Sequence, residues 1–326
     1  MLTLVALALL PVPAGAASER VASLETELQP PAITTYQITQ YLARRTPTLS
    51  MPTTGADWTV EARRLRWKRL EEVIPHGWPR EWVGAPARIE DLGVVASTPV
   101  YRIRKLRYEI VPGYRAPAIL CEPARATRPV PGVLNPIGHE AAGKAVAHAQ
   151  HRCAAFAKLG MVALSPEWPG FGELTHPDNA HDFAAHLDLV GANGIGFFYL
   201  TLPRALAVLA HRPHVDLSRR AARAAADAAH PQHRRRVLLP RRPGEAGGRR
   251  RGHAVLRASA AALEPRTLDA VVTRDALPSL RALLDERVHF RVAPEVFCLD
   301  LYREFDVDRL TALAEPTKIY REGGRQ

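Results

Sequence analysis

The 326-residue sequence has few cysteines and no long apolar run in its interior. Its three cysteines, Cys121, Cys153 and Cys298, are too few for a disulfide framework, and we expect at most one bridge. Beyond the N-terminal residues, no segment provides the ~20 uninterrupted apolar residues of a membrane-spanning helix. Hydrophobic residues still make up 47% of the chain, which is ample for a core and excludes disorder throughout.

Two sequence signatures of hydrolytic sites are also missing. No serine lies in Gly-x-Ser-x-Gly, the tight turn that presents a nucleophile. His139 begins His-Glu-Ala-Ala-Gly and not His-Glu-x-x-His, so the zinc-protease pattern is excluded. One group of imidazoles and carboxylates would suit zinc or manganese but follows no ligand spacing: His176, Asp178, His181, Asp182, His186 and Asp188. We therefore predict neither a metal nor a cofactor.

The net charge of +11 comes almost entirely from one segment. Residues 219–257 contain twelve arginines, two acidic residues and no lysine, whereas the rest of the chain is close to neutral. In this segment 28 of 39 residues are Ala, Arg, Gly or Pro, and aromatic residues, isoleucine, serine and threonine are absent. Because a packed strand is hard to build from these residues, we predict an irregular Arg-rich segment after residue 217, spanning 218–262.

Three interpretations of the Arg-rich segment stay open. As a nucleic-acid arm it has charge but neither lysine nor interleaved aromatic residues, so nucleic acid is a disfavoured partner. A solvated, disordered insertion is compatible with its charge. The third interpretation is a reading-frame error, since Ala, Arg, Gly and Pro have codons that begin with two G or C bases. The 39 arginines against 5 lysines indicate a GC-rich gene, and we favour this third hypothesis.

The N-terminal residues 1–17 have the features of a secretory signal peptide. A short apolar run ends at the small residues Ala14-Gly15-Ala16, although the usual positive charge before the run is missing. A start codon placed inside or beside a longer leader is the alternative. We predict export, with the protein secreted or periplasmic.

Hydrophobic periodicity predicts an α/β protein. Residues 18–90 form a partly helical lead-in, with helical spacing over Val60–Ile74, and residues 101–111 and 116–121 alternate like the two strands of an antiparallel hairpin. Strand, helix and strand then follow in order, the pattern of a parallel βαβ unit. These three elements are predicted at residues 130–134, 145–159 and 161–164. We therefore expect a mostly parallel sheet flanked by helices in residues 91–217, including a helix over Gly194–Ala210.

The remaining residues, 263–326, return to an ordinary globular composition. A strand is predicted near residues 268–272, and a helix over Pro278–Asp285.

Parallel sheets bind their ligands in the loops at the carboxyl ends of the strands, here residues 135–144 and 165–182. Gly138 and His139 follow the first parallel strand, and Glu167 and Trp168 follow the second. We predict that these four residues line the pocket of the site. The alternatives are a polar loop for the first two and a solvent-facing loop with one aromatic anchor for the other two.

Several motifs follow one another along the chain: His76–Trp82, Tyr101–Glu109, Gly138-His139, Gly143-Lys144, Glu167–Glu173, His181–Phe183 and Gly191–Gly194. In this order they resemble the motifs of secreted bacterial α/β-hydrolases of the acetyl xylan esterase and dienelactone hydrolase type. The resemblance covers about residues 65–217 and, more weakly, 258–316. It implies a Ser-His-Asp carboxylic-ester hydrolase that acts on a small ester or an acetylated polysaccharide, with Gly138-His139 forming part of the oxyanion hole.

The chain departs from that pattern at all three catalytic positions. Ser165 ends a strand but is followed by Pro166, while Ser218 is interpreted as a helix N-cap and Ser259 as a mid-helix residue. The closest match to the serine turn has Glu245 in place of the serine, and a carboxylate there would not support acyl transfer.

We place neither the acid nor the histidine of the triad in this sequence. Residues 314–320 resemble the strand before the family's acid, and we expect that the family's final segment, which would supply the histidine, is absent. We predict an impaired catalyst with unassigned catalytic residues. The alternatives are a non-catalytic hydrolase-fold binding protein or polyanion binding through residues 219–257, and the sequence does not indicate an oligomeric state.

Overall fold

The computed structural model describes residues 25, 27–86, 88–137, 140–176, 183–220, 270–274, 277–285, 290 and 296–322. The predicted signal peptide, Glu245, Ser259 and most of the Arg-rich segment lie outside the described residues. The chain forms two compact units, residues 1–46 and 47–326. In the first unit, the described part contains helix α2 (Pro31–Arg45), which begins with proline at its first position, where the missing N–H costs nothing.

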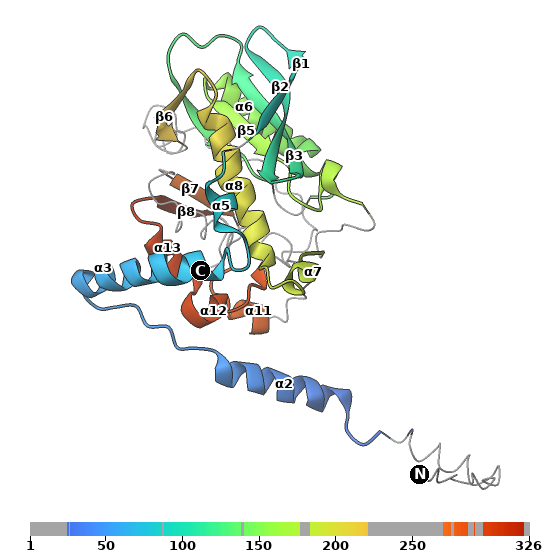
Figure 1. The fold of residues 1–326 in the computed structure, drawn as a ribbon, viewed down its shortest axis with the longest axis vertical. Coiled ribbons are helices and arrows are strands. Elements are labelled where there is room, and N and C mark those ends of the chain that lie inside the picture. Colours follow the sequence, from blue (N-terminus) through green and yellow to red (C-terminus); the bar gives the residue numbers. More distant parts are fainter. Residues whose placement is uncertain are drawn as a thin grey trace, which may run out of the picture. The chain divides into compact units, whose positions relative to one another are not determined.

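The second unit begins with the helical segment that the sequence predicts (Figure 1). Helix α3 (Gly55–Arg64) starts at Thr54, whose hydroxyl accepts a hydrogen bond of 3.1 Å from the Asp57 N–H. It continues as a π-helical turn, Leu65–Leu70, and as α4, Glu71–Val73. The short helix α5 (Arg80–Gly84) follows. The helical period expected over Val60–Ile74 is therefore confirmed.

A mixed six-stranded sheet forms the centre of this unit, in the order β1-β2-β3-β5-β4-β6. β1, β2, β3 and β5 pair antiparallel, and β5, β4 and β6 pair parallel. The predicted hairpin is β2–β3, and the predicted parallel pair is β4–β5, so both are confirmed. The strands are β1 Ile89–Ser97, β2 Tyr101–Val111, β3 Tyr114–Pro123, β4 Val130–Leu134, β5 Val162–Pro166 and β6 Val215–Arg220.

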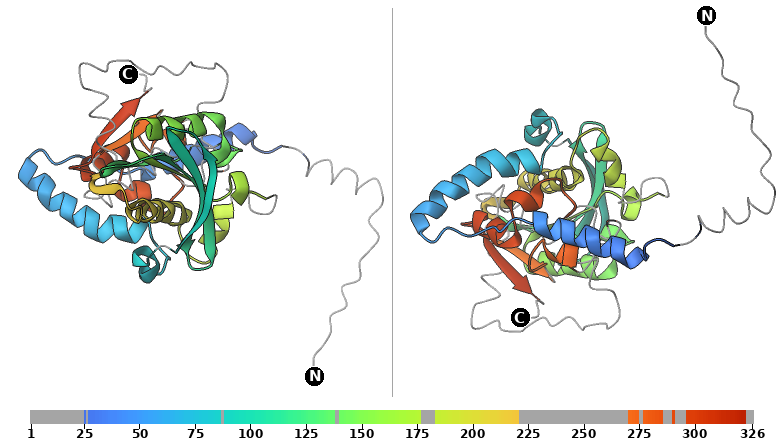
Figure 2. Two further views of the ribbon diagram at one scale, coloured as in Figure 1. Left: turned by 90° about the horizontal axis from the view of Figure 1, so that it is seen from above. Right: turned by 90° about the horizontal axis from the view of Figure 1, so that it is seen from below.

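Helices α6 (Ala147–Lys158) and α8 (Gly194–Ala210) cover opposite faces of the sheet (Figure 2, left). Successive strand residues point to opposite faces, and β5 shows this directly. Ala163 packs in a small cluster with Cys153 and Ala157 of α6, whereas Leu164 belongs to the large core that contains α8. The α/β class with helices on a partly parallel sheet is thereby confirmed.

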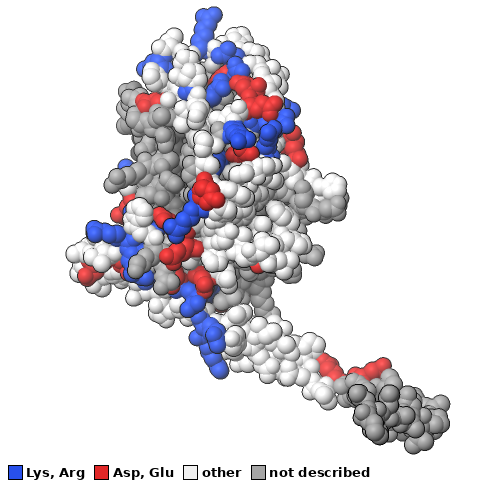
Figure 3. Space-filling model, in the orientation of Figure 1, with Lys and Arg blue, Asp and Glu red and all other residues white. Residues whose placement is uncertain are grey.

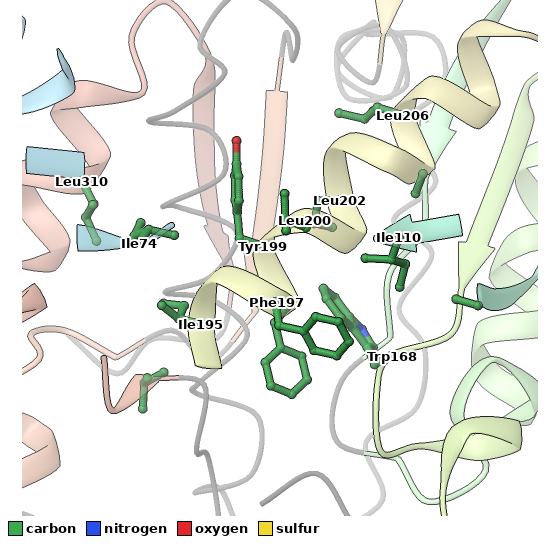
Figure 4. Close-up of a cluster of buried hydrophobic side chains, with 14 of the residues drawn as sticks. Ile74, Ile110, Trp168, Ile195, Phe197, Tyr199, Leu200, Leu202, Leu206 and Leu310 are labelled. Atoms are coloured by element: carbon green, nitrogen blue, oxygen red, sulfur yellow. The ribbon is translucent and has the colours of Figure 1, made fainter. Parts of the chain in front are cut away.

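Helix α8 is buried on nearly all sides because the sheet covers one side and the N-terminal and C-terminal helices cover others. The large core contains three side chains of α8 together with Ile110 of β2 and Trp168 (Figure 4). The three side chains of α8 are Phe197, Leu200 and Leu202. The bounds of α8 match those of the predicted helix.

One disulfide joins Cys121 of β3 to Cys153 of α6, with their Cα atoms 5.7 Å apart. Cys298 is a free thiol. The expectation of at most one bridge is confirmed. No helix in the described ranges combines the length and apolar character needed to cross a membrane.

The C-terminal segment forms a second, two-stranded parallel sheet from β7 (Ala270–Arg274) and β8 (Lys318–Glu322). Helices α12 (Leu301–Glu304) and α13 (Val307–Leu313) lie between them in sequence. The helix expected over 278–285 is shorter than predicted, because only α11 (Ala282–Asp285) is helical. The Leu280 N–H donates to the Asp306 carboxylate at 2.6 Å. The Ser279 and Leu280 carbonyls accept bonds from the N–H groups three residues later, so the chain begins here with tighter turns than those of an α-helix.

The helix N-cap predicted at Ser218 is wrong. Ser218 lies inside strand β6, which continues to Arg220, two residues past the expected start of the irregular segment at residue 218. Parallel pairing with β4 extends the strand, since Val215 pairs with Val130 and Arg220 with Gly132 across a bulge. A backbone ladder of this kind overrides the weak local preference of an Asp-Leu-Ser sequence.

Candidate functional site

The carboxyl ends of β4 and β5 are joined by buried polar side chains. Asn135, just after β4, is 3% exposed, and its Nδ2 donates to the hydroxyl of Ser165 at 2.8 Å. The same Nδ2 donates to the Ala149 carbonyl at 3.2 Å, while Arg152 donates to Asn135 Oδ1. Ser165 is 1% exposed. Its hydroxyl therefore belongs to a strand-end network and is not presented to solvent as a nucleophile.

A buried ion cluster lies between the loops that follow the same two strands. Lys144 Nζ is 2.8 Å from Glu167 Oε2, and their side chains are 2% and 1% exposed. Lys144 Nζ also donates to Glu173, whose side chain is 59% exposed. The hydrogen bond from Lys144 lowers the pKa of Glu173 below its usual value. Burial raises the pKa of Tyr114 to about 12, and the nearby Glu167 charge adds to this shift.

Trp168 also binds the loop after β4, near the start of that loop. Its indole Nε1 donates to the Ile137 carbonyl at 2.6 Å, and its ring lies 6.3 Å from that of Phe198. The side chain is 1% exposed. Trp168 thus connects the loop to the core around α8 (Figure 4).

Two of the four predicted site residues are described and buried, so the alternative of a solvent-facing loop is wrong for them. Glu167 and Trp168 are both buried and both contact the loop after β4. Gly138 and His139 lie outside the described residues. That these four residues line a pocket stays a prediction.

The group with metal-ligand side chains is only partly described. His176, His186 and Asp188 are within the described ranges, whereas Asp178, His181 and Asp182 are not. In the part of the chain that the structure describes, no three His, Cys, Asp or Glu side chains are placed to hold a metal ion.

The sequence does not indicate which residues bind the carboxylate of Glu167. Gly143-Lys144 and Glu167–Glu173 are both motifs of the resemblance, but a separation of 23 residues does not reveal that they meet. A second pair of motifs behaves in the same way. Trp78 Nε1 donates to the Asn193 carbonyl at 2.9 Å, and the Asn193 N–H donates to the His76 carbonyl at 2.9 Å. Hydrogen bonds therefore connect motifs that are far apart in the sequence.

Comparison with known proteins identifies the fold. No protein-family model matches the chain, and no curated protein is similar to it in sequence. Among solved structures, a proposed acetyl xylan esterase from Bacteroides fragilis aligns over 88% of this chain and 74% of its own, with a TM-score of 0.64 and 15% identity. The chain has the α/β-hydrolase fold. The resemblance seen in the motifs is thus confirmed for the fold.

Two further solved structures align less closely. The acetyl xylan esterase from Paenibacillus sp. R4 shares 17% identity over 88% of this chain and 78% of its own, with a TM-score of 0.44. The glucuronoyl esterase from Solibacter usitatus shares 12% identity over 86% of this chain and 80% of its own, with a TM-score of 0.47.

In an α/β-hydrolase the nucleophile lies on a strand-to-helix turn at the carboxyl end of the sheet. The last parallel strand of the six-stranded sheet is β6, which ends at Arg220. Residues 221–269, which follow it, lie outside the described residues. The described candidate site therefore consists of the ends of β4 and β5 with their buried polar joints.

Proposed function

We propose that this chain retains the scaffold of a carboxylic-ester hydrolase and binds a small ester or acetylated polysaccharide without Ser-His-acid turnover. The proposal rests on the lack of a serine that is placed to act as a nucleophile. No serine in the 326 residues lies in Gly-x-Ser-x-Gly, and Ser165, at the carboxyl edge of the sheet, is buried and bound to Asn135.

The chemistry of acyl transfer explains why these features support the proposed absence of turnover. Acyl transfer needs an exposed hydroxyl within hydrogen-bond reach of a histidine that a carboxylate orients. The Ser165 hydroxyl accepts its hydrogen bond from an amide, which does not take up a proton as a general base does. Ser165 is therefore a structural residue in this proposal.

The proposed substrate class rests on fold similarity to a proposed acetyl xylan esterase and on the resemblance of the motifs. In this proposal Gly138 and His139 line the ligand site, and Glu167 and Trp168 form its buried inner wall. The Cys121–Cys153 disulfide supports the proposed export, because such bonds persist in oxidising compartments.

Hydrolysis of p-nitrophenyl acetate by the purified chain tests the absence of turnover. We expect no hydrolysis that a serine-directed phosphonate abolishes, and we expect S165A to leave the background rate unchanged. Rapid, phosphonate-sensitive hydrolysis would contradict the proposal. Saturable binding of an acetylated xylo-oligosaccharide, measured by calorimetry, tests the binding function, and its absence would refute that part.

The gene sequence across codons 210–265 tests the origin of the missing nucleophile. If the Arg-rich composition of residues 219–257 reflects a reading-frame error, another frame encodes a Gly-x-Ser-x-Gly turn. If no frame encodes this turn, the reading-frame hypothesis fails.

A further inference from the structure

The carboxylate of Glu167 occupies a space that two glycines leave open. Gly143 and Gly172 both have left-handed backbone angles, with φ of +54° and +51°. A Cβ atom at Gly143 would lie 1.9 Å from Glu167 Oε1, and one at Gly172 would lie 2.2 Å from Glu167 Oε2. Any other residue at either position would displace the carboxylate.

The same carboxylate accepts hydrogen bonds from both loops. The Lys144 N–H donates to Oε1 at 2.8 Å and the Lys144 Nζ to Oε2 at 2.8 Å, while the Glu173 N–H donates to Oε2 at 3.4 Å. A direct backbone bond of 3.2 Å from Gly172 N to Ala141 O joins the loops as well. Glu167 is therefore the centre of a joint between the loop after β4 and the loop after β5.

Stability alone does not explain this arrangement. A buried ion pair gains little over apolar residues of the same size, because removing both charges from water offsets their attraction. The pair instead fixes the relative position of the two loops, since three hydrogen-bond donors together hold the Glu167 carboxylate in one orientation. Trp168, the neighbour of Glu167, fixes the other end of the loop after β4 through Ile137.

We infer that Glu167 is a positioning residue, which acts through Lys144 to hold the loop after β4 in its ligand-binding conformation. The inference rests on the proposed function, which puts the ligand at this edge of the sheet. Glu167 itself touches no reacting atom in this scheme.

Hydrogen exchange and ligand binding test the inference together. In E167Q we expect amide exchange in residues 140–146 and 167–174 to become at least tenfold faster. We also expect binding of an acetylated xylo-oligosaccharide to become at least tenfold weaker. The matched control is E122Q, which removes a carboxylate bound by Arg104 at 2.7 Å at the amino edge of the sheet. E122Q should leave both quantities within twofold of the wild type.

The double variant K144M/E167Q separates positioning from stability. Removing both charges should recover most of the thermal stability that either single change loses, whereas fast loop exchange and weak binding should persist. Recovery of wild-type exchange and binding in the double variant would overturn the inference, as would unchanged exchange in E167Q. If the wild-type chain does not bind the probe, the proposed binding function fails, and the exchange pattern alone decides whether Glu167 positions the loop.

Discussion

Ion clusters lie at both ends of the parallel strands of the central sheet, at their carboxyl edge and at their amino edge. The distances between the charged groups are similar in the two clusters, but the exposure of the side chains differs. At the carboxyl edge, Lys144 and Glu167 are 2.8 Å apart and almost fully buried. At the amino edge, Arg104 and Glu122 are 2.7 Å apart, with side chains 22% and 12% exposed. Charges of both signs mingle on the surface around β1 and β2 (Figure 3). The distance between the charges therefore does not show which cluster contributes more to stability.

Exposure to water makes the loss of a charged partner less costly at the amino edge than at the carboxyl edge. The amino-edge cluster includes Asp91 and Arg212, which are 3.2 Å apart, and solvent stabilises each of these charges when a partner is lost. At the carboxyl edge a lost partner leaves an uncompensated charge inside the protein. Substitutions at the two edges should therefore differ in size.

The largest effect is expected from K144M. It leaves the Glu167 carboxylate buried without its cation, and we expect a loss of about 3–5 kcal/mol in the free energy of unfolding. Urea denaturation measures it. A loss below about 1 kcal/mol would mean that water reaches Glu167, and the contrast between the edges would disappear.

A smaller loss is expected from W168F. The change removes the donor of the hydrogen bond to the Ile137 carbonyl, and an unpaired buried carbonyl costs about 1–3 kcal/mol. Urea denaturation again reports the change. The control is W67F, because Trp67 is 67% exposed and should be nearly neutral. Equal effects of the two changes would argue against the loop joint.

At the amino edge, E122Q should cost less than about 1 kcal/mol, and the cost should shrink at high salt. Denaturation at low and high salt concentration checks both statements. A loss as large as that of K144M would show that the two clusters are equivalent.

The smallest effect is a pH dependence carried by Glu173. Its pKa is lowered in the folded chain, so its ionised form stabilises the fold above the unfolded pKa of about 4.3. This contribution is lost as the pH falls through the lower folded pKa. The stability advantage of the wild type over E173Q should therefore be complete at neutral pH and vanish in acid. A constant difference in melting temperature from pH 7 to pH 3 would contradict it.

Much of the fold could be predicted because its elements have strong local patterns. The hairpin of β2 and β3 alternates with period two, and α8 is a 17-residue helix of mostly apolar residues that ends just before His211. The shortened helix α11 and the strand at Ser218 could not be predicted. In both cases a backbone group finds its partner in a distant segment, at Asp306 or in β4.

The candidate site divides in the same way. The α/β architecture, the absence of a serine turn, and the loops that contain Glu167 and Trp168 could all be inferred from the sequence, because they depend on local patterns and motifs. Only the tertiary structure decided that Glu167 is buried against Lys144 and that Gly143 and Gly172 make room for it. These contacts join two separate loops, and their geometry exists only when the neighbouring strands are paired.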